Sequence, residues 1–221
     1  MGLNFKQMKH YFTIAFTLIL GFTLNAQNQE KAKEILDKVS AKTKEYTTIK
    51  ADFSFAMENL QEEISEIHEG TILLKGNKYK VSLMGVDTYY DGTIIYTHML
   101  DAEEVNISEP DPDDETTLNP ATIFTIYENG YNYMYVGETT ENGKTFHEID
   151  LFPENRDKPF SRIKLKIEKD NLQLYSLSQV GKDGSNYTIT VKQMTNNSPM
   201  NDSNFVFDQN ANPEVDVIDM R

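Results

Sequence analysis

The sequence predicts an α+β fold that is mainly antiparallel β, with one N-terminal helix, one short inserted helix and about eleven strands. Two observations predict it. An apolar period of 3.6 residues near the start of the chain changes to a period of two. Short alternating segments then recur at roughly 8–12 residue spacing, with Gly, Asn or Asp at the turns between them. No internal repeat or low-complexity linker divides the 221 residues, so we expect one domain.

Residues 1–26 have the pattern of a secretory signal peptide. Lys6 and Lys9 precede an apolar run from Tyr11 to Leu24, and Ala26 supplies the small residue that a signal peptidase accepts. The run is roughly 14 residues long and a membrane span needs about 20, so a membrane anchor is the less favoured alternative. We expect export to the periplasm, cleavage after Ala26 and a mature domain over residues 27–221.

The charge and the cysteine count exclude several classes of function. The chain has no Cys, which excludes disulfides, thiol nucleophiles and cysteine metal sites. Its net charge is −14, and removing the leader, with its two lysines and no acid, makes the mature domain more acidic still. Such a charge disfavours binding to nucleic acid and to anionic lipid head groups.

The first expected element of the mature chain is an amphipathic helix over residues 29–46, with Asn28 in the N-cap position. Its apolar stripe is Ala32, Ile35, Leu36 and Val39. Alternation then predicts strands, which are, in order, residues 49–58, 64–75, 78–83, 86–90, 93–100, 103–108, 132–138, 144–152, 161–168, 172–180, 185–193 and 204–208.

One segment interrupts the strands. An acidic, proline-containing loop from Glu109 to Glu115 leads to Asn119-Pro120, which is typical of a helix start, and the helix is expected over residues 121–128. The acidic run is a candidate for a calcium-binding loop, but it lacks the glycine and the glutamate spacing of an EF-hand. The helix is apolar on more than one stripe, so we expect it to lie on the sheet or in its mouth as a lid; the lid residues are Ile123, Phe124, Ile126 and Tyr127.

A sheet of about eleven strands curls, and beyond about eight strands the curl encloses space. Large apolar residues on the alternating strands therefore favour an apolar cavity of the size of a lipid. The residues predicted to line it are Phe53, Phe55, Met57, Ile72, Leu74, Tyr79, Val81, Leu83, Tyr90, Ile94, Tyr96, Tyr133 and Tyr135.

The motifs of common enzymes are missing from the sequence. His68, His98 and His147 stand far apart and have no partner at metal-ligand spacing. No nucleophile elbow, dinucleotide fingerprint or P-loop occurs. We therefore expect no catalytic activity, no cofactor and no metal. A hydrolase that uses two of the many carboxylates is kept as an alternative, because sequence does not show their separation.

The order of several segments resembles the LolA-like outer-membrane lipoprotein carrier proteins. These segments are AKEILDKVSAKTKEYTTIKADFSF, EGTILLKGNKYKVSL, DTYYDGTIIYTH, NPATIFTIYENGY and the closing FVFDQNANPEVDVIDMR. The resemblance implies an incompletely closed barrel of about eleven strands, with helices as a lid over an apolar cavity.

The resemblance also implies a function. The protein would be a periplasmic chaperone that takes acylated lipoproteins from an inner-membrane transporter to an outer-membrane acceptor, as a monomer and without catalysis. A related module that senses lipids or lipoproteins is the alternative. One departure stands out: family members carry an arginine that holds the lid, whereas the matching position after Lys75 reads Gly76-Asn77 here.

Overall fold

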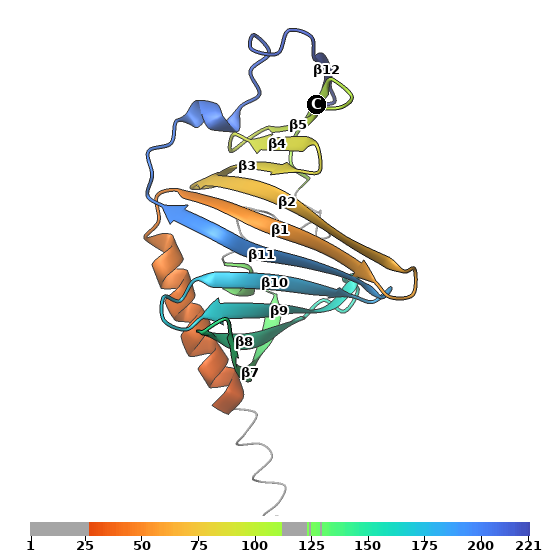
Figure 1. Cartoon of the computed structure of the whole chain (residues 1–221). Coiled ribbons are helices and arrows are strands. Elements are labelled where there is room, and N and C mark those ends of the chain that lie inside the picture. Colours follow the sequence, from red (N-terminus) through yellow and green to blue (C-terminus); the bar gives the residue numbers. More distant parts are fainter. Residues whose placement is uncertain (1–26, 112–122, 124, 129) are drawn as a thin grey trace, which may run out of the picture.

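The computed structural model describes residues 27–111, 123, 125–128 and 130–221 (Figure 1). The predicted signal peptide and residues 121, 122 and 124 of the predicted inserted helix lie outside these residues. In the described part of the chain, no helix is both long enough and apolar enough to cross a membrane.

The N-terminal helix covers residues 27–44 and confirms the predicted helix, but Asn28 lies within it and is not its N-cap. Its apolar stripe is buried, with Leu36 only 1% exposed. The opposite side carries two ion pairs at i,i+4 spacing, Lys33–Asp37 and Glu34–Lys38, each 2.6 Å long. The helix is therefore stabilised chiefly by burial of one face against the sheet, since exposed ion pairs contribute little.

The strands form one large sheet that is open, because its two end strands, β12 and β7, do not pair with each other. The order across the sheet is β12-β6-β5-β4-β3-β2-β1-β11-β10-β9-β8-β7. The bounds are β1 (Ile49–Asn59), β2 (Ile64–Lys75), β3 (Lys78–Leu83), β4 (Val86–Tyr90), β5 (Ile95–Met99), β6 (Glu104–Ser108), β7 (Tyr131–Glu141), β8 (Lys144–Pro153), β9 (Phe160–Glu168), β10 (Leu174–Gly181), β11 (Ser185–Asn196) and β12 (Asp216–Asp219).

We call the face of the sheet that packs against the N-terminal helix the inner face. Register places Tyr135, Ile149, Leu165 and Leu177 in one row across β7 to β10, and all four are buried in one core with the helix. In a second row, Leu74 on β2 pairs with Tyr79 on β3, and both residues belong to the same core. The helix, shown at the lower left of Figure 1, thus covers the inner face over β7–β10 and the nearby ends of β1 and β2.

Gly70 on β2 lies directly across from Phe53 on β1, and the ring of Phe53 occupies the space of a side chain at position 70. A Cβ atom there would lie 2.5 Å from Cζ of Phe53 and 3.0 Å from the carbonyl oxygen of Ser82. Gly70→Ala is therefore expected to destabilise the fold by about 1–3 kcal/mol in urea unfolding. Gly137→Ala, which meets no atom within 4 Å, is the control, and an equal loss there would contradict the steric explanation.

The segment after β11 corrects one predicted strand. Residues 204–208 do not form a strand; η3 (Asp202–Phe205) is a 3-10 helix, and Phe205 and Phe207 are buried against the sheet. Phe207 packs with Val105 on the outer face of the sheet, which is the face opposite the helix. The apolar residues at alternate positions therefore mark a segment that packs on the sheet and is not a strand of it. The chain then adds β12, which runs parallel to β6 and was not predicted as a strand.

Two lysines of the β2–β3 hairpin hold this C-terminal segment. Lys75 and Lys78 lie 2.7 and 2.9 Å from the carboxylate of Asp202. Hydrogen bonds from these lysines lower the pKa of the Asp202 carboxyl to about 2. The C-terminal segment is thus tied down at η3, by its buried phenylalanines and by β12.

The predicted inserted helix is also corrected where it can be compared. Residues 123 and 125 lie in a turn, and η2 (Ile126–Glu128) is a single 3-10 turn in which the Glu128 amide donates to the Thr125 carbonyl at 2.9 Å. Gly130, with a φ of +77°, follows this turn closely, and 3-10 turns are the usual form of such short pieces. Phe124 lies outside the described residues.

Candidate functional site

The inner face is divided into a covered and an open part. Leu74, Tyr79 and Tyr135 are buried in the core beneath the N-terminal helix. Four further predicted cavity residues are partly buried against the same core: Ile72, Val81, Tyr90 and Tyr133. The rings of Tyr79 and Tyr90 lie 5.3 Å apart. These residues share the predicted face, and they pack into or against the core that the apolar stripe of the helix also joins.

The open part lies toward the far end of β1 and β11. Phe55 and Met57 pair with Ile189 and Tyr187 across the two strands, so all four share the inner face. None of them belongs to the buried core; Phe55, Met57 and Ile189 are half-buried and Tyr187 is 37% exposed. The rings of Phe55 and Tyr187 stack at 6.1 Å with an interplanar angle of 10°. We call these four residues the apolar strip.

Phe53 and Leu83 stand beside the strip on the same face. Phe53 is buried over Gly70, and Leu83 pairs with Gly70 from β3 and is half-buried. The prediction that Tyr96 lines the cavity was wrong. Tyr90 lies on the inner face and pairs with Ile95, so the next residue, Tyr96, lies on the outer face. There it packs against Val105, Phe207 and Val215. Ile94 lies in the turn before β5.

The structure describes three of the four predicted lid residues, and all three pack in or against the core that includes the N-terminal helix. Ile123 and Ile126 pack against the core, and Tyr127 is only 7% exposed. The Tyr127 hydroxyl donates a hydrogen bond to the carbonyl oxygen of Leu36. Burial raises the pKa of the Tyr127 phenol to about 12. The segment is thus anchored by one buried aromatic ring whose polar end is satisfied.

A polar contact between the N-terminal helix and residue 128 lies next to this ring. Ser40 donates a hydrogen bond to the Glu128 carboxylate, and Lys44 lies 2.6 Å from the same oxygen. Hydrogen bonds from Lys44 and from Ser40 lower the pKa of the Glu128 carboxyl. We call Ser40, Lys44 and Glu128 the latch. Sequence reasoning missed it, because a contact over more than eighty residues leaves no local pattern; Ser40 and Lys44, one turn apart on the helix, were the only signal.

A pocket of about 260 Å³ lies beside the latch. It is bounded by the end of the N-terminal helix, the start of β1, the end of β2 and Thr125 of the lid segment; Tyr46, Ile49 and Leu74 are its larger apolar residues. Ligand pockets are commonly about 300 Å³ or larger. The pocket therefore has room for only part of a long acyl chain while the lid segment lies as it does.

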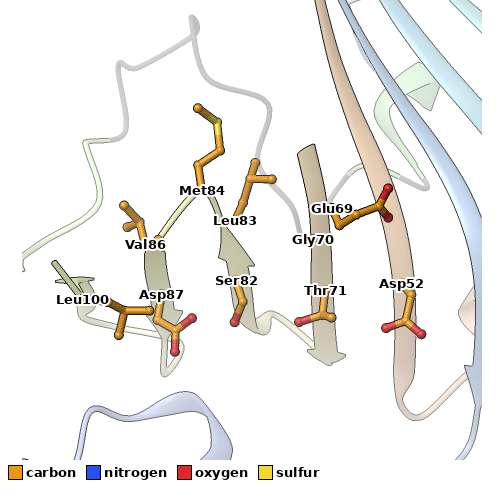
Figure 2. Close-up of a pocket in the computed structure, with 11 residues that line it drawn as sticks. Asp52, Glu69, Gly70, Thr71, Ser82, Leu83, Met84, Val86, Asp87 and Leu100 are labelled. Atoms are coloured by element: carbon orange, nitrogen blue, oxygen red, sulfur yellow. The ribbon is translucent and has the colours of Figure 1, made fainter. Parts of the chain in front are cut away.

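A larger pocket of about 450 Å³ crosses β1 to β4 (Figure 2). Its floor is a row of polar side chains, Asp52, Thr71, Ser82 and Asp87, which pair across the strands. Figure 2 shows this row pointing one way and Leu83, Met84 and Val86 pointing another. Because the row alternates with the inner-face residues, the floor belongs to the outer face. Its carboxylates make it unsuited to an acyl chain.

Two of these acids are ion-paired. Asp87 lies 2.8 Å from Lys80, and Glu69, at the side of the pocket, lies 2.6 Å from Lys192. Burial alone would raise the pKa of the Asp87 carboxyl, but hydrogen bonds from Lys80 and Ser82 outweigh it, so this pKa is lowered. In the described residues, no group of three His, Asp or Glu side chains could hold a metal ion.

His147 on β8 is a buried titratable group beside the core. It is 8% exposed, next to Tyr135 and 3.5 Å from the carboxylate of Glu138. Burial lowers its pKa from 6.5, although Glu138 acts in the opposite direction. The unfolded chain therefore binds a proton at His147 more readily than the folded chain does. The stability that neutral His147 contributes above about pH 6.5 is lost as the pH falls from there through the lowered pKa of the folded state.

We expect the free energy of unfolding to fall between pH 7 and pH 5, before the carboxylates titrate. Urea unfolding at several pH values measures it. In His147→Gln this decline should be absent, while the steeper loss below about pH 4, where carboxyls such as Asp202 protonate, should remain. A variant with the same decline between pH 7 and 5 would show that another group causes it.

The described part of the chain is an open sheet with a half-exposed apolar strip and a 3-10 turn that is held on the N-terminal helix, as in a binding protein. The model of the family of outer membrane lipoprotein carrier protein LolA matches residues 22–180. The chain belongs to this family. The comparison of the sequence with curated proteins gives no match.

Solved structures with the same fold are distant in sequence. An uncharacterized conserved protein from Thermus thermophilus has a TM-score of 0.56 at 12% identity, over 86% of this chain and 99% of that one. A DUF1329 family protein from Desulfovibrio piger has a TM-score of 0.51 at 10% identity, over 81% and 97%. The LolA superfamily protein NE2245 from Nitrosomonas europaea has a TM-score of 0.43 at 11% identity, over 80% and 97%. At these identities the structures show the fold alone.

Proposed function

We propose that this protein is an exported, periplasmic carrier that binds the acyl chains of lipoproteins and moves them from the inner to the outer membrane without catalysis. The family supports the lipoprotein cargo. The observation that carries the proposal is the apolar strip, which the domain leaves half-exposed toward the far end of β1. The segment that is latched to the helix lies near the start of the same strand. The donor would be an inner-membrane transporter and the acceptor an outer-membrane protein.

The latched segment explains how a carrier can release its cargo. Each buried methylene contributes about 0.8 kcal/mol, so full burial of a long acyl chain would give about 10 kcal/mol and very slow release. Tyr127 and Ile126 occupy apolar surface on the helix side. If an acyl chain displaces them, the contacts that they lose are subtracted from the affinity for the chain.

The carboxylate hydrolase is disfavoured by the geometry of the outer-face pocket. Asp52 and Asp87 stand on β1 and β4, three strands apart, which at about 4.8 Å per strand is about 14 Å. Paired glycosidase carboxylates lie about 5–10 Å apart. The closer acid, Glu69, has a side chain that is 63% exposed and pairs with Lys192, whereas an acid catalyst needs burial to raise its pKa.

Native mass spectrometry of the protein purified from the periplasm tests the proposal. A carrier should co-purify with acylated peptides, and mild detergent should remove them. Phe55→Asp, purified in the same way, should be empty. Protein without any bound acyl species, in cells that contain lipoproteins, would contradict the carrier function. Binding of free lipid but no acylated peptide would favour the lipid-sensing module.

A further inference from the structure

The β1–β2 hairpin has an open edge that the rest of the fold does not use. β3 pairs with β2 only from Gly70 to Lys75, so residues 64–69 of β2 have β1 on one side and no strand on the other among the described residues. All of these residues except His68 are exposed. Figure 1 shows the hairpin extending past its neighbours at the right of the view. Its backbone groups can therefore accept another strand.

The charge along this hairpin has one sign. Between Lys50 and Lys75 there are six acidic residues and no Lys or Arg. Glu58, Glu62, Glu63 and Glu66 surround the outer end, and all four are exposed. Like charges directly opposite each other are destabilising, so a second copy of this edge would be repelled. An anionic membrane surface would be repelled as well.

Apolar side chains stand among these acids. Leu60 is 91% exposed, Ile67 is 70% exposed and Ile64 is 38% exposed. A single exposed leucine is ordinary, but three such residues at one end of a hairpin that also has an open edge are not scattered. They would gain free energy from burial against a partner.

The tip of the hairpin has a fixed shape. The side-chain oxygen of Asn59 accepts hydrogen bonds from the amides of Gln61 and Glu62, at 3.0 and 3.2 Å, and its amide group donates to Ser185 at 3.0 Å. Asn59 is only 4% exposed. Leu60 is thus presented by a structured turn, which lowers the entropy that a partner must overcome on binding.

We propose that residues 60–69 are a docking site for an extended, basic segment of a partner protein, which pairs as an additional strand with the edge of β2. Its lysines or arginines would face Glu62 and Glu66, and its apolar residues would contact Leu60 and Ile67. Strand addition supplies backbone hydrogen bonds, and the alternating side chains supply specificity. Glu66 and His68 pair with Met57 and Phe55, so this site borders the apolar strip, but it does not depend on the proposed cargo.

The test uses a fluorescent eight-residue peptide of alternating lysine and valine, with fluorescence anisotropy and hydrogen exchange as readouts. We expect the peptide to bind the mature protein and to slow amide exchange at residues 64–69. The double variant Glu62→Lys/Glu66→Lys should bind it at least roughly tenfold more weakly, and Leu60→Ser several-fold more weakly. The control for net charge is Glu154→Lys/Glu214→Lys, which changes two exposed acids elsewhere on the molecule and alters the charge by the same amount; it should keep most of the affinity.

Three results would overturn the proposal. Equal loss in Glu154→Lys/Glu214→Lys and in Glu62→Lys/Glu66→Lys would show that the peptide responds only to net charge. Binding without slower exchange at residues 64–69 would exclude strand addition. Vesicles of phosphatidylcholine with about 30% phosphatidylglycerol that bind wild type but not Leu60→Ser would make the tip a membrane contact, and the acids would then serve only to prevent edge-to-edge pairing.

Discussion

Replacing Phe55 with Asp is expected to abolish binding of an acyl chain while leaving the fold largely intact. Phe55 is half-buried and stacks on Tyr187 in the apolar strip, so a carboxylate there remains hydrated in the empty protein. When an acyl chain covers the strip, that carboxylate must lose its water. An uncompensated buried charge costs several kcal/mol, and about 3 kcal/mol already weakens binding by more than a hundredfold.

Displacement of a fluorescent fatty acid measures this loss, and urea unfolding measures the fold. Val136→Asp is the matched control, because Val136 is 52% exposed on β7 and lies outside the strip. It should bind the fatty acid like the wild type. Unchanged binding by Phe55→Asp would place the acyl site elsewhere on the molecule.

Removing the ring of Tyr127 is expected to tighten acyl binding, although it destabilises the empty protein. The ring is buried on the N-terminal helix and its hydroxyl bonds to Leu36. Truncating a buried aromatic residue to Ala costs about 3–5 kcal/mol. If the lid contacts compete with the ligand as proposed, part of that free energy should appear as higher affinity, by at least roughly tenfold, and as slower release.

Tyr127→Phe separates the ring from its hydrogen bond. It keeps the apolar contact and should change affinity by only a few-fold, since one hydrogen bond contributes about 1 kcal/mol. Stopped-flow release of the fluorescent fatty acid into vesicles measures the rates. If Tyr127→Ala bound the fatty acid more weakly than the wild type, the segment would be part of the binding surface and not a competitor for it.

The elements that follow from local periodicity were predictable. The stripe of Ala32, Ile35, Leu36 and Val39 located the helix and its buried side. Strict alternation in β1 and β9 located strands and their faces. These signals are short-range, because a helix turn and a strand pleat repeat within a few residues.

Features that depend on contacts between distant parts of the chain were not predictable from the sequence. Tyr90 and Tyr96 look alike in the sequence, yet the turn between them places them on opposite faces. The alternation of Phe205 and Phe207 is the same for a paired strand and for a segment that packs on a sheet. The latch needs the helix and residue 128 to be close in space, and the one-turn spacing of Ser40 and Lys44 does not show which residue they contact.

The position of β12 has a consequence for the time course of folding. β12 pairs with β6 in parallel, Val217 beside Val105, although more than a hundred residues separate them in the chain. Such non-local pairing is slow to form, because the loop must close before the contact is gained. If the chain is exported as proposed, N-terminus first, the partner of β6 arrives last. Until then β6 is an uncapped edge, and the newly exported chain is most vulnerable to aggregation and proteolysis in that interval.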